Sequence, residues 1–216
     1  MTERLSPDQV TFYRDQGYIL VENLLDAETL DALRRETAAI LEAARSVEQN
    51  DAVYDLEDSH TPDAPRVRRI KTPRLHFPFF KTLSEYQPIL DVLRQLIGPD
   101  VRYQGDKLNM KSAEYGAPVE WHQDLAYFPH TNDDLVTMLL YLDDASEHNG
   151  CLRVLPRHHT HFFDHHTPDG YFAGMATEDL DCGRFGQAVS LEAPAGSVIL
   201  MHCITPHSSG PSTTDS

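Results

Sequence analysis

The chain has 216 residues, of which 34 are acidic and 18 are basic, and its net charge is −16. A protein this acidic is repelled by nucleic acid and by anionic membrane surfaces, so neither is an expected partner. Hydrophobic residues make up 40% of the chain, which is typical of a globular protein, and no apolar run approaches the roughly 18 residues of a membrane-spanning helix. The three cysteines show no paired spacing, which argues against a disulfide framework and against a structural zinc site.

The first element that the sequence predicts is a short helix. Ser6 is its expected N-cap, Pro7 its first helical residue, Gln9 the partner that closes a capping box, and Gly17 its end. The residues before it lack a basic region followed by an apolar one, as a secretion signal would have. This favours a cytoplasmic location.

Residues 18–21 are apolar and β-prone, so they are predicted to form a strand. Asp26 then caps a long helix, and residues 46–65, which are polar, acidic and broken by prolines, are predicted to form an exposed loop. A second amphipathic helix is expected over residues 87–97, ending at Gly98. One face of the long helix carries apolar residues at helical spacing: Leu30, Leu33, Ile40 and Leu41.

From residue 101 the pattern changes to short apolar or alternating runs separated by turn-forming clusters. These runs cover residues 101–110, 135–142, 151–155, 188–191 and 197–201. Helices followed by many short strands predict an α+β, mainly β fold with an antiparallel barrel or double sheet as its core. We expect one domain over residues 1–216, with a helical flank and first strands in 1–100 and the β core in 101–216.

One sequence, His122-Gln123-Asp124, points to chemistry. Side chains two residues apart on a strand share a face, so an imidazole and a carboxylate here converge on one metal while Gln123 turns away. Together with a later histidine, His207, they make the 2-His-1-carboxylate arrangement that leaves positions open for O2 chemistry at Fe(II). By itself the pair is also compatible with polar residues on an exposed strand edge.

The surrounding residues resemble the phytanoyl-CoA dioxygenase family of Fe(II)/2-oxoglutarate-dependent oxygenases. Five stretches carry the resemblance, occur in the family's order and span nearly the whole chain. They are GYILV at 17–21, KLNMK at 107–111, WHQDLAYFP at 121–129, NGCLRVLP at 149–156 and PHSSGP at 206–211. The third stretch, with its His-Gln-Asp-Leu-x-Tyr-Phe-Pro pattern, is the most specific.

This resemblance implies a double-stranded β-helix (a jelly-roll, cupin-like core) with N-terminal flanking helices. It also implies Fe(II) held by His122, Asp124 and His207, with 2-oxoglutarate and O2 as co-substrates. The expected activity is hydroxylation of a C–H bond in a small-molecule substrate, with succinate and CO2 as co-products. Because related halogenases carry a small residue in place of Asp124, the carboxylate favours hydroxylation. His202 is the rival third ligand, and the family pattern favours His207.

One feature of the family is missing from these residues. The resemblance implies an Arg ten or eleven residues after His207 that binds the distal carboxylate of 2-oxoglutarate, and that position lies beyond Ser216. The core strand that carries this Arg is missing with it. Three explanations stay open: the sequence stops early, which we favour; another base binds the co-substrate; or the protein is an inactive jelly-roll that holds metal without turnover.

Residues 66–74 form the only dense basic run of this acidic chain. They either bind an anion, such as 2-oxoglutarate or a carboxylate or phosphate of the substrate, or form a solvated strand face that balances the acidic loop at 46–65. Arg69 is the member nearest to a family position that contacts the co-substrate. Lys107 and Asn109, on the strand before the ligand strand, are better placed to face the cavity.

Two further groups of side chains have an ordinary explanation that we prefer. The histidines after Pro156 are interpreted as exposed loop residues rather than a second metal site: His158, His159, His161, His165 and His166. Four aromatic residues are expected in the core, although an apolar substrate pocket is the alternative: Tyr127, Phe128, Phe162 and Phe163.

Overall fold

The helices of this protein come mainly from the first half of the chain. The computed structural model describes residues 5–111, 116–128 and 130–214, so Pro129 and Ser216 lie outside the described residues. Five α-helices are present in that part: α1 (Pro7–Gln16), α2 (Ala27–Ala43), α3 (Pro73–His76), α4 (Pro78–Leu83) and α5 (Gln87–Ile97). Three short 3-10 helices accompany them: η1 (Ala44–Ser46), η2 (Asp124–Ala126) and η3 (Glu147–Asn149).

The first two predicted helix starts are confirmed. The side chain of Ser6 accepts a hydrogen bond from the backbone of Gln9, whose own side chain closes the capping box. Helix α1 ends at Gly17, whose φ of 84° lies in the left-handed region that glycine adopts without strain. At the start of α2 the Asp26 carboxylate accepts from the backbone N–H of Thr29.

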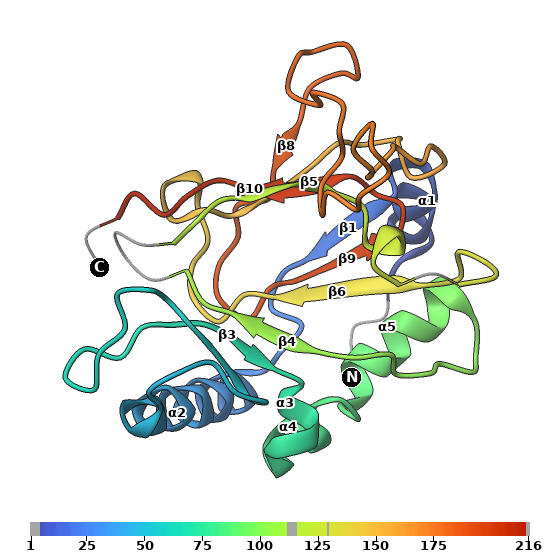
Figure 1. The fold of residues 1–216 in the computed structure, drawn as a ribbon. Helices are drawn as coiled ribbons and strands as arrows, with labels where there is room; N and C mark the ends of the chain where they lie inside the picture. Colours follow the sequence, from blue (N-terminus) through green and yellow to red (C-terminus); the bar gives the residue numbers. More distant parts are fainter. Residues whose placement is uncertain (1–4, 112–115, 129, 215–216) are drawn as a thin grey trace.

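In the described part of the chain, ten strands form three antiparallel sheets. The first sheet has the order β1-β9-β6, the second β5-β10-β7-β8 and the third β2-β3-β4. The strands are β1 (Tyr18–Val21), β2 (Tyr54–Leu56), β3 (Val67–Lys71), β4 (Lys107–Asn109), β5 (Val119–His122), β6 (Val136–Leu140), β7 (Leu152–Val154), β8 (Val189–Ser190), β9 (Val198–His202) and β10 (His207–Ser209). Figure 1 shows β5 and β10 above the first sheet, with α2 and α4 below it.

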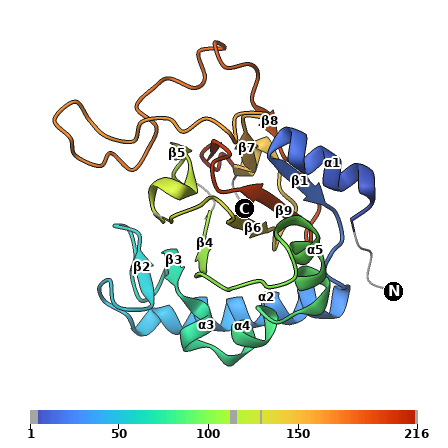
Figure 2. The ribbon, with the colours of Figure 1, turned by 90° about the vertical axis from the view of Figure 1, so that its right-hand side faces the viewer.

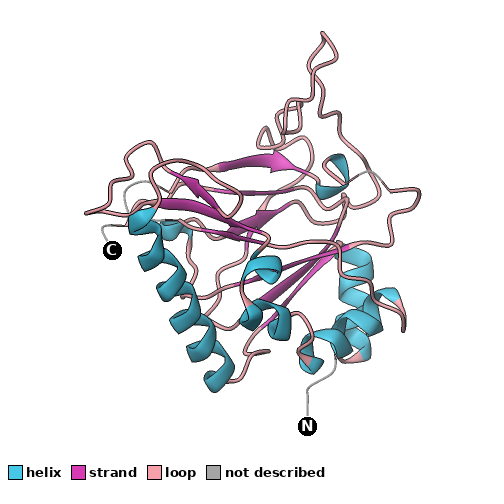
Figure 3. Cartoon of the chain, turned by 60° about the horizontal axis from the view of Figure 1, so that its bottom comes forward, coloured by secondary structure: helices cyan, strands magenta, loops and turns pink. Residues whose placement is uncertain are grey.

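Strand β9 separates two apolar layers because its side chains alternate between its faces. Val198 and Leu200 pack into the core that the helices complete, together with Leu33 of α2. Ile199 and Met201 point the other way, into a cluster shared with β7. Helices α2 and α4 therefore lie on one side of the first sheet and the second sheet lies on the other (Figure 2). Seen from below, helices lie in front of the strands (Figure 3).

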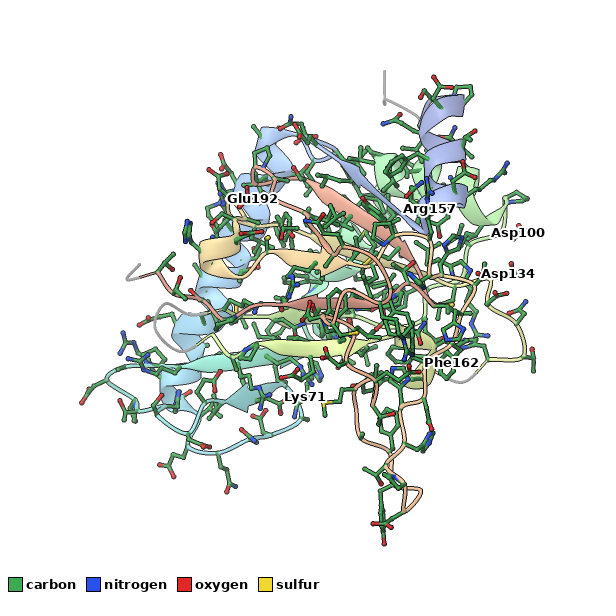
Figure 4. All side chains as sticks on the ribbon, turned by 90° about the horizontal axis from the view of Figure 1, so that it is seen from above. Lys71, Asp100, Asp134, Arg157, Phe162 and Glu192 are labelled. Atoms are coloured by element: carbon green, nitrogen blue, oxygen red, sulfur yellow. The ribbon has the colours of Figure 1, made fainter. Side chains whose placement is uncertain are left out.

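A long excursion, residues 155–188, connects β7 to β8 and covers the outer face of the second sheet. Its Phe163, which is 1% exposed, packs in one cluster with Trp121 of β5. Near its start, Arg157 lies beside α1 (Figure 4), and its backbone N–H donates to the carbonyl of Gln16 at 2.9 Å. The excursion thus forms a fourth layer behind the strand that carries His122.

Two expectations differ from the structure. The predicted loop at 46–65 contains strand β2, which pairs with β3 across a bulge. Of the predicted strand at 101–110, only the three residues of β4 form a strand, and they pair with β3. In both cases the pairing partner is remote in sequence, and period-2 alternation does not reveal it. Among the described residues, no helix is long and apolar enough to span a membrane.

Candidate metal centre

Three side chains converge between the sheets, two from neighbouring strands and one from the short helix that follows the first of them. His122 ends β5, and His207 begins β10 directly opposite it in the antiparallel register. Gln123 is extended, with φ −126° and ψ 130°, so Asp124 at the start of η2 returns to the face of His122. The Nε2 atoms of His122 and His207 each lie 3.9 Å from a carboxylate oxygen of Asp124, and the two ring centroids are 4.1 Å apart.

This cluster suits a divalent metal ion. One possible ligand atom from each residue lies within 4.8 Å of the others, and the three residues are buried. The histidine at the end of β9 stays outside the cluster: His202 lies 3.7 Å from an Asp133 carboxylate oxygen, and its ring faces that of His159. The geometry therefore brings His207, and not His202, to His122 and Asp124.

Backbone hydrogen bonds fix which nitrogen of each imidazole is free. Nδ1 of His122 lies 2.8 Å from the carbonyl oxygen of Glu120, and Nδ1 of His207 lies 3.0 Å from that of Thr205. A carbonyl only accepts, so each Nδ1 carries the proton and donates it. In the neutral ring, Nε2 then has a bare lone pair directed at the cluster, as metal-ligating histidines require.

The surroundings favour the protonation states that bind a metal. Burial, reinforced by the proximity of His207, lowers the pKa of His122 well below its usual value. Burial acts to raise the pKa of Asp124, but attraction to His207, a hydrogen bond from Thr137 and attraction to His122 together hold that pKa below its usual range. The cluster therefore offers a neutral His122 and an ionised carboxylate near neutral pH.

Thr137 is a site residue that the sequence does not reveal. It lies on β6, and its hydroxyl donates to Oδ2 of Asp124. Hydrogen bonds to a ligating carboxylate orient it and tune its basicity. The only signal is a single polar residue within an apolar strand, and threonine is common in strands for other reasons.

The residues expected to bind the co-substrate stand on the third sheet. Arg69 of β3 and Asn109 of β4 are register partners, and Nε of Arg69 donates to the Asn109 side-chain oxygen at 3.3 Å. Lys107, two residues before Asn109, points to the same face. The protein around its ammonium lowers the pKa of Lys107, an effect that the attraction of Asp124 partly offsets and Arg69 reinforces. Lys107 is therefore close enough to Asp124 for the carboxylate to act on its pKa.

Part of the basic run at residues 66–74 pairs with the acidic segment, and part of it remains near the triad's neighbours. Asp55 lies on β2, within the acidic segment. It forms an ion pair with Lys71 at 2.9 Å and a longer one with Arg69 at 3.8 Å. The acidic segment therefore does balance part of the run. The Arg69 guanidinium is still close enough to Tyr127 to lower its pKa, although burial dominates and raises it. The Tyr127 ring in turn meets His122 edge-on at 5.7 Å.

Two expectations about the neighbouring segment are corrected. His165 is completely buried rather than exposed, because this part of the excursion packs against the ligand strand. His158 and His159 are half-buried, and only His161 and His166 are exposed as expected. Of the four aromatic residues expected in the core, only Phe163 is buried. The other three are 41–47% exposed: Tyr127, Phe128 and Phe162.

Comparison with known proteins gives relatives for the whole chain. A family model described as phytanoyl-CoA dioxygenase (PhyH) matches residues 13–216. A probable alpha-ketoglutarate-dependent hypophosphite dioxygenase of Stutzerimonas stutzeri is 32% identical over 211 residues, which cover 94% of this chain and 72% of that protein. The ectoine dioxygenase of Bordetella parapertussis is 27% identical over 225 residues, with 96% and 70% covered.

Solved structures share the fold. EctD from S. alaskensis with bound Fe has a TM-score of 0.79 at 23% identity and covers 98% of this chain, which matches 73% of EctD. The alpha ketoglutarate dependent carbocyclase SnoK has a TM-score of 0.75 at 23% identity, with 98% and 80% covered. The fold and the His-Asp-His cluster together define a non-haem iron dioxygenase that depends on 2-oxoglutarate. The chain belongs to the phytanoyl-CoA dioxygenase family.

The hydrogen bond from Thr137 provides a test of the metal centre. Thr137→Val removes the hydroxyl at nearly constant volume, so the pKa of Asp124 should rise. Protons then compete with the metal at a higher pH than before. We expect Mn(II), titrated by electron paramagnetic resonance, to bind about tenfold more weakly, with the larger loss at acidic pH. Thr137→Ser keeps the hydroxyl and should retain most of the affinity. Equal affinity in the valine variant and the parent at both pH values would contradict this role.

Proposed function

We propose that this protein hydroxylates an unactivated C–H bond of a small molecule, with 2-oxoglutarate and O2 consumed and succinate and CO2 formed. The observation that carries this proposal is the convergence of two imidazole Nε2 lone pairs and one ionised carboxylate between the sheets. Three protein ligands on one face leave the remaining positions of a metal open for co-substrates. Related halogenases carry a small residue in place of Asp124, which leaves room for a halide at the metal. The carboxylate of Asp124 fills that position and so favours hydroxylation.

Each site residue has a proposed role. His122, Asp124 and His207 are the catalytic residues that hold Fe(II). Lys107, Asn109 and Arg69 are proposed to bind 2-oxoglutarate. A dianionic co-substrate requires cations and N–H donors, and the third sheet presents them beside the triad. When bound, the iron with 2-oxoglutarate and O2 supplies the oxidising power, while the protein fixes the ligands' protonation and the cation positions.

The substrate is proposed to be small and polar. The relatives named above are dioxygenases of hypophosphite and of ectoine. In this chain, the charged and amide side chains of the third sheet line the proposed co-substrate site with polar groups. A small polar substrate fits next to such a site better than an uncharged hydrocarbon does.

We also propose that the two facing sheets are the halves of a jelly-roll within a single domain. All pairings within them are antiparallel, and a continuous apolar cluster fills the space between them. Among the described residues, β6 is an edge strand, and its apolar Met138 is 38% exposed. Strand β4 lies beside β6 without pairing with it (Figures 1 and 2). A further core strand along β6 would complete the jelly-roll at this edge.

Removal of one metal ligand tests the activity. His122→Ala should reduce succinate formation from 2-oxoglutarate by about 100-fold or more, because the two remaining ligands bind iron weakly and hold it in the wrong geometry. His202→Ala is the matched control, since this histidine ends β9, five residues before His207, but stays outside the triad, and it should keep most of the activity. If the parent chain and His122→Ala form succinate at equal rates, the proposed function is wrong.

The role of Arg69 is tested against its neighbour in the strand. Arg69→Met should raise the KM for 2-oxoglutarate by about tenfold or more, because a hydrogen bond to a charged group is worth about 1.5–3 kcal/mol. Arg68→Met removes the same charge one residue away, at the bulge of the β2–β3 pairing, where the side chain is exposed. Steady-state succinate assays of both variants decide the point. An unchanged KM in Arg69→Met, or an equal rise in both, excludes the assignment.

A further inference from the structure

Gln123, the residue between two of the triad side chains, has a side chain that is completely buried on the opposite face of the strand. Its side-chain NH2 donates to the carbonyl oxygens of His161 and Ile204, both at 2.6 Å. Its side-chain oxygen accepts from the backbone N–H of Phe163 at 2.8 Å. A buried amide is tolerated only when such partners are present, so this environment is specific for glutamine.

His165 fixes the backbone of the same residue. It is also completely buried, and its Nδ1 lies 2.8 Å from the carbonyl oxygen of Phe163, which only accepts. Nδ1 therefore carries the proton, and Nε2 is free to accept from the backbone N–H of Gln123 at 3.1 Å. The side chain and the backbone of Gln123 are thus both held by the excursion at residues 161–165.

These bonds lie where the strand ladder stops. Strand β5 ends at His122, which pairs with His207 at the start of β10, so the ladder does not extend to Gln123. The Gln123 amide spans the gap, since Ile204 belongs to the turn that leads into β10. One side chain therefore joins the segment that carries His122 and Asp124, the turn before His207, and the excursion behind both.

We propose that Gln123 and His165 are positioning residues of the metal centre. They lock the ligand strand against the 203–206 turn and the excursion, and so set the separation of the two imidazoles and the carboxylate. Because alternate side chains of a strand turn together, a rotation of Gln123 rotates His122 and Asp124 on the other face. This inference rests on the proposed function, in which those residues hold iron.

Two substitutions at His165 separate positioning from folding. His165→Gln can keep an acceptor near the Nε2 position, whereas His165→Asn can keep only the donor near Nδ1. We expect the asparagine variant to bind Mn(II) about tenfold more weakly than the parent and the glutamine variant to bind it nearly as well. Gln123→Met, which removes all three side-chain bonds, should lose at least as much affinity as His165→Asn.

His158 supplies the matched control. It lies on the same excursion, and its Nε2 hydrogen-bonds the backbone carbonyl of Phe185 at 2.7 Å rather than a backbone group of the ligand strand. His158→Asn should lower the Tm without changing the Mn(II) affinity. If His165→Asn and His158→Asn lower the Tm and both leave the affinity unchanged, the proposal is overturned. Equal affinities of the two His165 variants also overturn it. If Gln123→Met does not fold, the His165 pair decides alone. Failure of the parent chain to bind Mn(II) would instead refute the proposed function.

Discussion

The antiparallel pairing of His122 with His207 is the interaction on which the site depends. It brings together two imidazoles that are far apart in the sequence, and a slip of one residue in either strand would turn one ring to the opposite face. Each ring is then oriented by a hydrogen bond to a carbonyl of its own strand region. The metal-binding lone pairs are therefore products of backbone geometry, and the layers of the fold serve to keep that geometry fixed.

Near this pair of histidines there are positively charged side chains, although the net charge of the molecule is strongly negative. The chain carries a net charge of −16, yet Lys107 is close enough to Asp124, and Arg69 close enough to Tyr127, for its charge to act on the pKa of that neighbour. Asp55 neutralises mainly Lys71, with which it forms the shorter of its two ion pairs. Local positive potential in an acidic protein concentrates small anions at one place while the rest of the surface repels polyanions. This suits an enzyme whose co-substrate is a dianion.

Features that depend on nearby residues could be predicted from the sequence. The caps at Ser6 and Asp26 involve partners within four positions, and both are present in the structure. The ligand motif was recognisable because its flanking residues match a family pattern, which made its chemistry specific. The likeness to the family is confirmed over residues 13–216.

Features that depend on remote contacts were missed. Nothing in the sequence distinguishes His165 from its exposed neighbours, because its burial comes from Gln123, 42 residues away. Thr137 looks like any strand threonine until β6 places its hydroxyl on Asp124. The exposure of three of the four aromatic residues expected in the core also depends on remote contacts. Whether a ring is buried or lines an open site is decided by what packs against it, and Phe163 alone of the four lies under other side chains.

We propose that His122, Asp124 and His207 hold one iron ion. Anomalous X-ray diffraction at the iron edge, from crystals loaded anaerobically with Fe(II), tests this directly. We expect one dominant peak within coordination distance of Nε2 of His122, Nε2 of His207 and the Asp124 carboxylate. A dominant peak beside His159 and His202, or no peak at the triad in fully loaded crystals, would contradict it.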